Sequence, residues 1–364
     1  MPSGIARICN DARAAKARFY VLRSVEHCTS IGADPTTNRG DPIMLLRTRP
    51  LGPALARSAA AAAFAFTLGV HAAEPVKLNI AMVPVLDAAP FLYAQAKGYY
   101  KDAGLEVSFA TNDSGPAVVT GVLNGTYDAA AAAWFPVAIA IAKGAKLKYV
   151  MTASQVEKGP GNGHSGLVVK AGSPIKGYKD LEGKTVATNA LTSLTTLATK
   201  MQMKAAGADP ERVKFSALPF KSSLQAVAQD QVDAAVVVSP FQTEGELAGL
   251  RIVGDPILEA MPKGGAGLVL FTSDASGAKK KDAFAAFNKA TFRAADELAA
   301  STELQRKVAQ EVIGLPAEVA RKVPLPGIAT QPIDVDALQK QLDAAHAFGY
   351  LAHPLKAADT VLGR

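Results

Sequence analysis

Cysteine and histidine are scarce in this 364-residue chain. The two cysteines, Cys9 and Cys28, both precede residue 44, so the rest of the chain can neither require nor misform a disulfide bond. That composition suits an oxidising compartment. After residue 73 the histidines are His164, His346 and His353. Thiol catalysis and cysteine-based metal binding are therefore excluded from this part of the chain.

Short catalytic motifs are missing as well. The sequence has no H-E-x-x-H, no G-x-S-x-G and no G-x-x-x-x-G-K-[ST]. The usual signatures of zinc hydrolases, serine hydrolases and P-loop proteins are thus absent. We predict no catalytic residue, no metal and no cofactor. A ligand-sensing regulator would carry a DNA-binding helix-turn-helix near its start. Residues 44–73 occupy that position and have a different pattern, described below, which argues against a regulator.

The positive charge of the chain is concentrated at its beginning. Lys and Arg number 39 against 32 Asp and Glu, but residues 1–73 hold 9 of the basic and 4 of the acidic residues. The remaining residues carry 30 Lys and Arg against 28 Asp and Glu. A nearly neutral surface removes the main argument for a nucleic-acid partner.

Residues 44–73, MLLRTRPLGPALARSAAAAAFAFTLGVHAA, have the pattern of a secretory signal peptide. A basic region with three arginines precedes an apolar run over residues 58–70, which is too short to span a bilayer. Small or moderate side chains at Val70 and Ala72 suit a cleavage site. We therefore expect the mature protein to start near Ala73 or Glu74 in the periplasm, and residues 1–43 to be an over-extended start outside it.

Short strand-like and helix-like runs alternate after residue 76. The predicted strands are residues 78–83, 106–111, 128–134, 147–153, 166–170, 184–188, 214–218, 233–238 and 268–272. Helices are predicted between them, at residues 90–97, 116–124, 136–144, 192–206 and 221–229, and the chain is mostly helical from residue 279. Alternation of this kind predicts α/β sheets with mainly parallel strands and helices on both faces.

The pattern restarts after a glycine-rich loop at residues 159–166, which predicts two lobes. Residues 74–163 and 267–364 are expected to form the first lobe, and residues 164–266 the second. Two crossings between the lobes make a hinge, and a hinge between two lobes makes a cleft.

The run PFLYAQAKGYYKDAGLEVSFA, residues 90–110, resembles periplasmic solute-binding proteins of the nitrate, sulfonate and taurine uptake type, which serve ATP-binding-cassette importers. The segments VLNGTYDAAAA, IKGYKDLEGKTVAT and AVAQDQVDAAVVVSP match in the same order. The resemblance implies the two-lobed type II fold of periplasmic binding proteins, a small anionic ligand, a membrane permease as partner and a monomeric state. Within the run, Gly98 should end a helix in the left-handed conformation.

Two departures from the family pattern concern the expected ligand. Ser239 stands where many members carry a charged residue before a proline, and Trp134-Phe135 replaces small residues. Both changes make the site less charged and more apolar. An organic anion, a sulfonate or an aromatic or aliphatic carboxylate, is therefore expected rather than nitrate or taurine.

Ligands of open α/β sheets bind beyond the carboxyl ends of the strands. Loops at these ends open helices here, and free N–H groups of helix starts attract anions. Together with residues near the crossovers, these loops supply the candidate ligand-binding residues: Asp87, Ala88, Ala89, Ser114, Gly115, Trp134, Phe135, Asn162, His164, Asn189, Thr192, Ser193, Ser239 and Phe241.

Each candidate also has a purely structural interpretation. Ser114, Thr192 and Ser193 are common helix-capping residues. Trp134 and Phe135 could be core, and Asn162 and His164 could lie on a surface loop. An enzyme on the same fold, acting on a small heterocyclic or carboxylate substrate, is the alternative function. The cysteine-rich motif of the related thiamine-pyrimidine synthases is absent.

Overall fold

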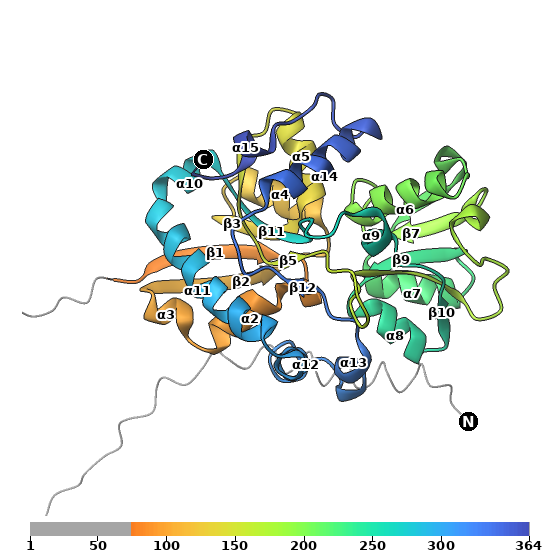
Figure 1. Ribbon diagram of the computed structural model, residues 1–364, viewed down its shortest axis with the longest axis horizontal. Helices are drawn as coiled ribbons and strands as arrows, with labels where there is room; N and C mark the ends of the chain where they lie inside the picture. The colour runs from red at the N-terminus through yellow and green to blue at the C-terminus, as the bar shows by residue number, and fades with distance from the viewer. Residues whose placement is uncertain (1–73, 364) are drawn as a thin grey trace, which may run out of the picture. The chain divides into compact units, whose positions relative to one another are not determined.

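The computed structural model describes residues 74–363, so the predictions for residues 1–43 and 44–73 lie outside the described residues. Two five-stranded sheets organise this part of the chain (Figure 1). The first has the order β2-β1-β3-β11-β4, formed by β1 (Val76–Met82), β2 (Leu105–Thr111), β3 (Ala129–Ala133), β4 (Leu147–Thr152) and β11 (Leu268–Ser273). The second has the order β10-β6-β9-β7-β8, formed by β6 (Ser165–Lys170), β7 (Thr185–Thr188), β8 (Lys214–Ala217), β9 (Ala234–Val238) and β10 (Leu250–Ile252).

The predicted fold class is confirmed: the structure has two α/β lobes with helix-covered sheets. All nine predicted strands are present, with ends shifted by at most two residues. Three strands were not predicted, β10 and the pair β5 (Ser154–Gln155) and β12 (Gly327–Ile328). Each has only two or three residues, too few for a recognisable hydrophobic alternation.

One strand in each sheet runs against its parallel neighbours, and each follows a crossing between the lobes. Strand β6 begins at Ser165, which pairs with Val238 at the end of β9. Strand β11 begins at Leu268, which pairs with Ala133 at the end of β3. The starts of both reversed strands therefore lie at the sheet edge where the parallel strands end. We propose that the lobes divide at the predicted boundaries, 163/164 and 266/267, because β6 and β11 start there.

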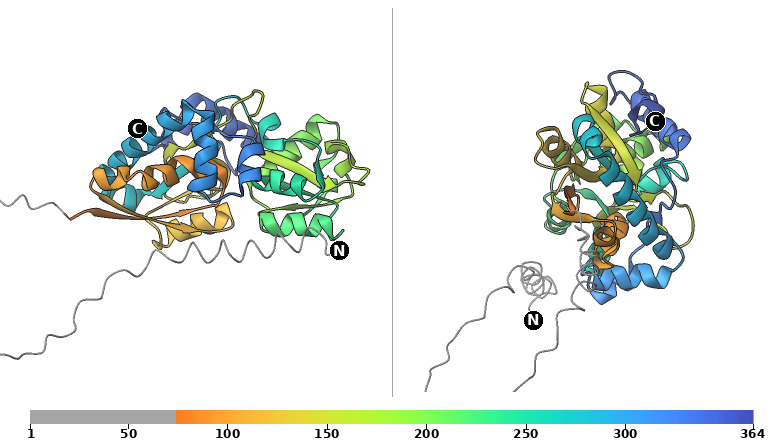
Figure 2. Two further views of the ribbon diagram at one scale, coloured as in Figure 1. Left: turned by 90° about the horizontal axis from the view of Figure 1, so that it is seen from below. Right: turned by 90° about the vertical axis from the view of Figure 1, so that its left-hand side faces the viewer.

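Helices cover both faces of the second sheet (Figures 1 and 2). Leu167 and Val169 of β6 join one apolar cluster with Met203 of α6, while Val168 between them joins another with Leu224 of α7. Two buried faces explain why β6 and β9 of this sheet are mainly apolar. The helices are η1 (Leu86–Ala88), α2 (Ala89–Ala96), α3 (Tyr99–Asp102), α4 (Gly115–Leu123), α5 (Trp134–Ala142), η2 (Tyr178–Leu181), α6 (Leu194–Ala205), η3 (Pro210–Arg212), α7 (Phe220–Ala228), α8 (Phe241–Leu247), α9 (Pro256–Ala260), α10 (Asp274–Lys279), α11 (Lys281–Ala299), α12 (Thr302–Glu311), α13 (Ala317–Lys322), α14 (Val335–Ala347) and α15 (Ala357–Thr360).

The turn at Gly98 joins α2 to α3 and buries two tyrosines against α11. Gly98 has a φ of 76°, which confirms the predicted left-handed conformation. The ring of Tyr100 stacks on Phe287 with 4.6 Å between centroids, and its hydroxyl lies 2.9 Å from Thr291 Oγ1. The tyrosines thus pack on a helix from a distant part of the chain.

Replacing Gly98 with Ala should destabilise the protein although there is room for the methyl group. A Cβ at this position meets nothing within 4 Å, so the cost is the left-handed backbone, about 1–2 kcal/mol. Gly172 also has open space but lacks a positive φ, and Gly172→Ala is the matched control. Urea unfolding should show a lower free energy of unfolding for Gly98→Ala and an unchanged one for Gly172→Ala. Equal effects of the two substitutions would contradict the conformational explanation.

Candidate functional site

A cavity of about 80 Å³ lies between the two lobes. Since one water needs roughly 10–15 Å³ on the same measure, the cavity has room for a small molecule. The first lobe contributes Val83, Val85, Asp87, Gly115, Ala133, Pro136, Gly267 and Leu268. The second contributes His164, Asn189, Ser193, Leu194, Thr195, Phe220, Val238 and Ile257. None of these sixteen residues is Lys or Arg, and most of them are apolar.

Four helices begin at the cavity: α4 and α5 from the first lobe, α6 and α7 from the second. Gly115, Leu194 and Phe220 are the first residues of α4, α6 and α7, and Ala133 is the N-cap of α5. The N–H groups of a first helical turn have no partner inside the helix and carry its positive dipole end. The cavity therefore combines apolar walls with a positive potential from the backbone.

Glycine is required where two of these helix starts meet. A Cβ on Gly115 would lie 2.6 Å from Cγ of Pro136, so any larger residue would force α4 and α5 apart. Ser114, the N-cap of α4, makes no side-chain capping bond, whereas the Ser193 hydroxyl accepts a hydrogen bond from the Thr196 N–H at 3.4 Å. Ser193 therefore occupies one N–H group of α6 itself.

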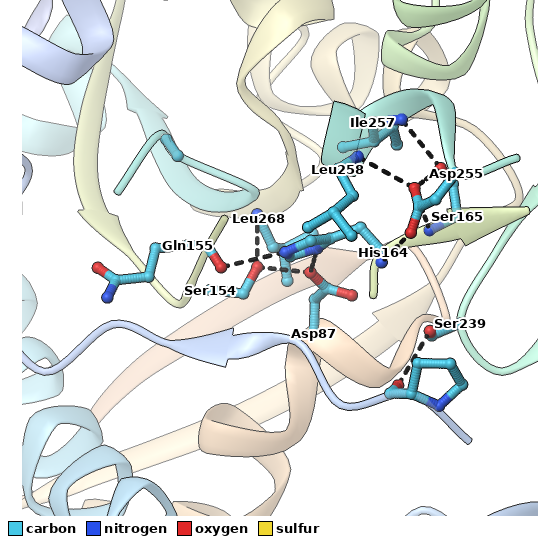
Figure 3. A network of polar contacts seen from close by, with 12 residues as sticks. Asp87, Ser154, Gln155, His164, Ser165, Ser239, Asp255, Ile257, Leu258 and Leu268 are labelled. Carbon is cyan, nitrogen blue, oxygen red and sulfur yellow. Dashed lines mark hydrogen bonds and ion pairs between the residues drawn. The ribbon is translucent and has the colours of Figure 1, made fainter. Parts of the chain in front are cut away.

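Asp87 and His164 form a buried pair across the two lobes (Figure 3). Asp87 follows β1, and His164 immediately precedes β6. Asp87 Oδ1 lies 3.3 Å from His164 Nδ1 and accepts a 2.5 Å hydrogen bond from Ser154 Oγ. Ser154 Oγ in turn accepts the Leu268 N–H at 2.9 Å. The carboxylate thus joins the ends of β1, β5, β6 and β11.

The contacts of His164 define its protonation. Nε2 lies 3.1 Å from the backbone carbonyl oxygen of Gln155, which can only accept, so Nε2 carries a hydrogen. Nδ1 faces the Asp87 carboxylate. With both nitrogens directed at acceptors, the ring is an imidazolium whose two N–H groups are already used by the protein.

The electrostatic environment supports an ion pair. Burial works against the Asp87 carboxylate, but hydrogen bonds from His164 and Ser154 and the imidazolium charge place the pKa of Asp87 below its ordinary value. Burial also works against the imidazolium, but the hydrogen bond and charge of Asp87, the charge of Asp255 and the Gln155 carbonyl raise the pKa of His164. Both directions favour the charged forms at neutral pH.

Asp255 fixes the backbone on which His164 is mounted. Its Oδ2 accepts the His164 N–H at 2.9 Å, and its Oδ1 accepts the N–H groups of Ser165 at 3.1 Å and Leu258 at 3.0 Å. Asp255 is the N-cap of α9, on the segment that leads back to the first lobe. The two crossings between the lobes are thereby tied together beside the cavity.

Five of the predicted residues line the cavity: Asp87, Gly115, His164, Asn189 and Ser193. Four of them follow strands, as the rule that ligands meet the carboxyl ends of strands predicts, and His164 comes from the first crossing between the lobes. Their contact with a ligand remains a proposal.

Trp134 and Phe135 need a correction, because both side chains are fully buried and neither lines the cavity. Helix α5 begins at Trp134, two residues before the predicted start at Pro136. The Trp134 carbonyl accepts a hydrogen bond from the Tyr149 hydroxyl at 2.8 Å, and Phe135 packs edge-on against Tyr350. The structure therefore places neither Trp134 nor Phe135 in the cavity wall.

Seven further candidates lie outside the cavity lining. Ala88 and Ala89 are core residues, Thr192 is exposed and Ser114 is half-buried. Asn162 pairs with Leu325 in a different groove, and Phe241 packs behind Phe220. Ser239 is fully buried and its groups are satisfied by protein: Oγ donates to the Pro324 carbonyl at 3.3 Å and accepts from Gln242 Nε2, while its carbonyl accepts the Leu86 N–H.

The residues that sequence reasoning missed are mostly apolar. Leu194 and Phe220 start helices that follow β7 and β8, so the rule used for Asn189 could have found them. Gly267 directly precedes β11 and Leu268 is its first residue, and only the reversed direction of this strand brings them to the cavity. Ile257 belongs to α9, and its N–H donates to Ser165 Oγ at 3.0 Å.

Among residues 74–363, no group of three or more His, Cys, Asp or Glu side chains is arranged to hold a metal ion. In the same range no helix combines the length and the apolar character needed to cross a bilayer.

The family model described as "NMT1/THI5 like" matches residues 86–303, more than half of the chain. The chain belongs to this family. A curated relative, the nitrate import ATP-binding protein NrtC of Synechocystis sp., is 28% identical over 127 residues, which are 34% of this chain and 19% of that protein. The chain thus spans about a fifth of the length of that relative.

Solved structures show the same two-lobed fold as this NMT1/THI5-like chain. The periplasmic aliphatic sulphonate binding protein SsuA from Escherichia coli aligns with a TM-score of 0.62 at 20% identity, over 79% of this chain and 98% of that one. The alkanesulfonate-binding protein SsuA from Xanthomonas axonopodis, bound to MOPS, aligns with a TM-score of 0.65 at 21% identity, over 79% of this chain and 99% of that one. The periplasmic nitrate-binding protein NrtA from Synechocystis aligns with a TM-score of 0.60 at 14% identity, over 79% of this chain and 86% of that one.

The Asp87–His164 pair should make stability depend on pH. Because the pKa of His164 is raised, its contribution is complete below the ordinary value of 6.5 and is lost as the pH rises through the folded-state value. Because the pKa of Asp87 is lowered, its contribution is complete above 3.8 and is lost as the pH falls through the folded-state value. His164→Gln should therefore cost about 3 kcal/mol near pH 5.5, measured by urea unfolding, and less near pH 9.

The exposed Glu318, which pairs with Lys322 one helical turn away, provides the control. Glu318→Gln should change the unfolding free energy by less than about 1 kcal/mol at either pH. A loss for His164→Gln that stays constant from pH 5.5 to pH 9 would show that the imidazolium charge does not stabilise the fold.

Proposed function

We propose that this protein is the periplasmic substrate-binding component of an ATP-binding-cassette importer. It captures a small organic anion, a sulfonate or a carboxylate, between its lobes and delivers it to a permease in the inner membrane. Family membership supports this function, as does the structural similarity to periplasmic sulfonate- and nitrate-binding proteins. Export through the signal sequence at residues 44–73 and a monomeric state are part of the proposal.

The observation that carries the proposal is the convergence of four helix starts on a cavity without Lys or Arg. Unpaired N–H groups and aligned peptide dipoles stabilise an anion while the walls remain apolar. Asp87 and His164 cancel each other's charge within the lining. A monovalent anion with an apolar body fits this combination better than a strongly hydrated inorganic ion does.

A binding role is favoured over catalysis by the geometry of Ser154, Asp87 and His164. An activated serine would donate its hydroxyl proton to a histidine base. Here Ser154 and His164 both bond to the same oxygen of Asp87, and both nitrogens of His164 already have acceptors. The cluster therefore has neither a free base nor an activated nucleophile, and its arrangement suits a structural and binding function.

The proposal predicts that organic anions stabilise the protein in a saturable way. A thermal-shift panel of alkanesulfonates, aliphatic and aromatic carboxylates and nitrate should contain compounds that raise the unfolding temperature. A ligand at 100 times its Kd stabilises by about 2.7 kcal/mol. Failure of every anion in the panel to raise the unfolding temperature would contradict the proposed function.

Asn189→Asp should then weaken binding of the best anion at least tenfold, as measured by calorimetry. Asn189 lines the cavity, and its Oδ1 accepts a hydrogen bond from Thr195 Oγ1 that a carboxylate would retain. Two like charges roughly 5 Å apart at an effective dielectric constant of about 20 repel by about 3 kcal/mol. Asn124→Asp is the matched control, because Asn124 is exposed at the far end of α4 and its Oδ1 also accepts hydrogen bonds. Unchanged affinity in Asn189→Asp would place the anion elsewhere.

A further inference from the structure

Asp87 has a second oxygen that the buried network does not use. Its Oδ1 meets both His164 Nδ1 and Ser154 Oγ. No other residue within 74–363 donates a hydrogen bond to Oδ2, and Figure 3 shows that oxygen turned away from both partners. The side chain is only 7% exposed, and Asp87 lines the cavity. A carboxylate oxygen of a cavity residue is therefore left without a donor from another residue of the protein.

The state of Asp87 makes it an acceptor and not a donor. His164 and Ser154 hold the carboxylate in one orientation, and the imidazolium balances its charge. A carboxylate in its ionised form has no hydrogen to give, so a ligand that displaces water from Oδ2 must bring an N–H or O–H of its own to replace the lost hydrogen bond. His164 cannot donate a hydrogen bond to the ligand, because both of its N–H groups already point at Asp87 and Gln155.

We propose that Asp87 determines specificity: the ligand carries a hydroxyl or N–H donor in addition to its anionic group, and this donor binds Asp87 Oδ2. The inference rests on the proposed function, since the anionic group would occupy the helix starts of the same cavity. An analogue without the donor would enclose Oδ2 in a dry site with no hydrogen bond. Sites built around such a group discriminate strongly against the analogue that lacks it.

The test compares ligands that differ only in the donor. Each of three series has a parent anion, its hydroxyl derivative and the methyl ether: ethanesulfonate with 2-hydroxy- and 2-methoxyethanesulfonate, propanoate with 3-hydroxy- and 3-methoxypropanoate, and benzoate with 4-hydroxy- and 4-methoxybenzoate. Calorimetry with the full-length mature protein should show at least one series in which the hydroxyl compound binds tenfold or more tightly than both others. The ether separates loss of the donor from the presence of an oxygen atom.

Two variants assign that preference to Asp87. In Asp87→Ala the advantage of the hydroxyl compound should fall below threefold, because no acceptor remains. Asp113→Asn, which changes an exposed carboxylate two residues before Gly115, should keep it. If Asp87→Ala does not fold, the double variant Asp87→Asn with His164→Gln removes both charges and keeps side chains of similar shape. The tighter binding of the hydroxyl compound should shrink in that variant as well.

The outcomes distinguish this inference from the proposed function. Anions that bind with equal affinity with and without the donor would overturn the specificity of Asp87 and leave the binding function in place. A hydroxyl preference that persists in Asp87→Ala would also overturn it. If no anion of any series binds, the proposed function fails and this inference fails with it.

Discussion

The direction of β6 and β11 is the constraint on which the site depends. Each strand follows a crossing between lobes and runs against its neighbours, so its start lies beside the ends of parallel strands. Residues before a strand, such as His164 and Gly267, therefore join residues after a strand, such as Asp87 and Asn189. A sheet with all strands parallel would leave only the second kind at this edge.

Backbone and side chains have separate tasks in the cavity. The positive potential for an anion comes from helix starts, whose N–H groups are held in place by the helices themselves. The walls can then be apolar, as at Val238 and Phe220, without a lysine or arginine that would need its own hydration or counter-ion. Glycine at position 115 lets two helix starts approach closely. Selectivity then falls to the few polar side chains that remain.

Asp87 connects the stability of the hinge with the chemistry of the site. One oxygen is held by His164 and Ser154 at the crossing between lobes, and the same side chain lines the cavity. A buried carboxylate persists only if its charge is balanced and its hydrogen bonds are made. The imidazolium of His164 supplies the balance, and Asp255 holds the backbone that carries it.

Local sequence was sufficient for nine strands, for the starts of α2, α4, α5, α6 and α7 to within two residues, for Gly98 and for five cavity residues, because periodicity, proline and glycine act over a few positions. It failed for Trp134, where a helix start two residues earlier than predicted accompanies a buried indole. It also could not join Asp87 to His164, or Gly267 to the cavity. Those contacts depend on strand direction and on packing between segments that are distant in the sequence, and both are determined only by the tertiary structure.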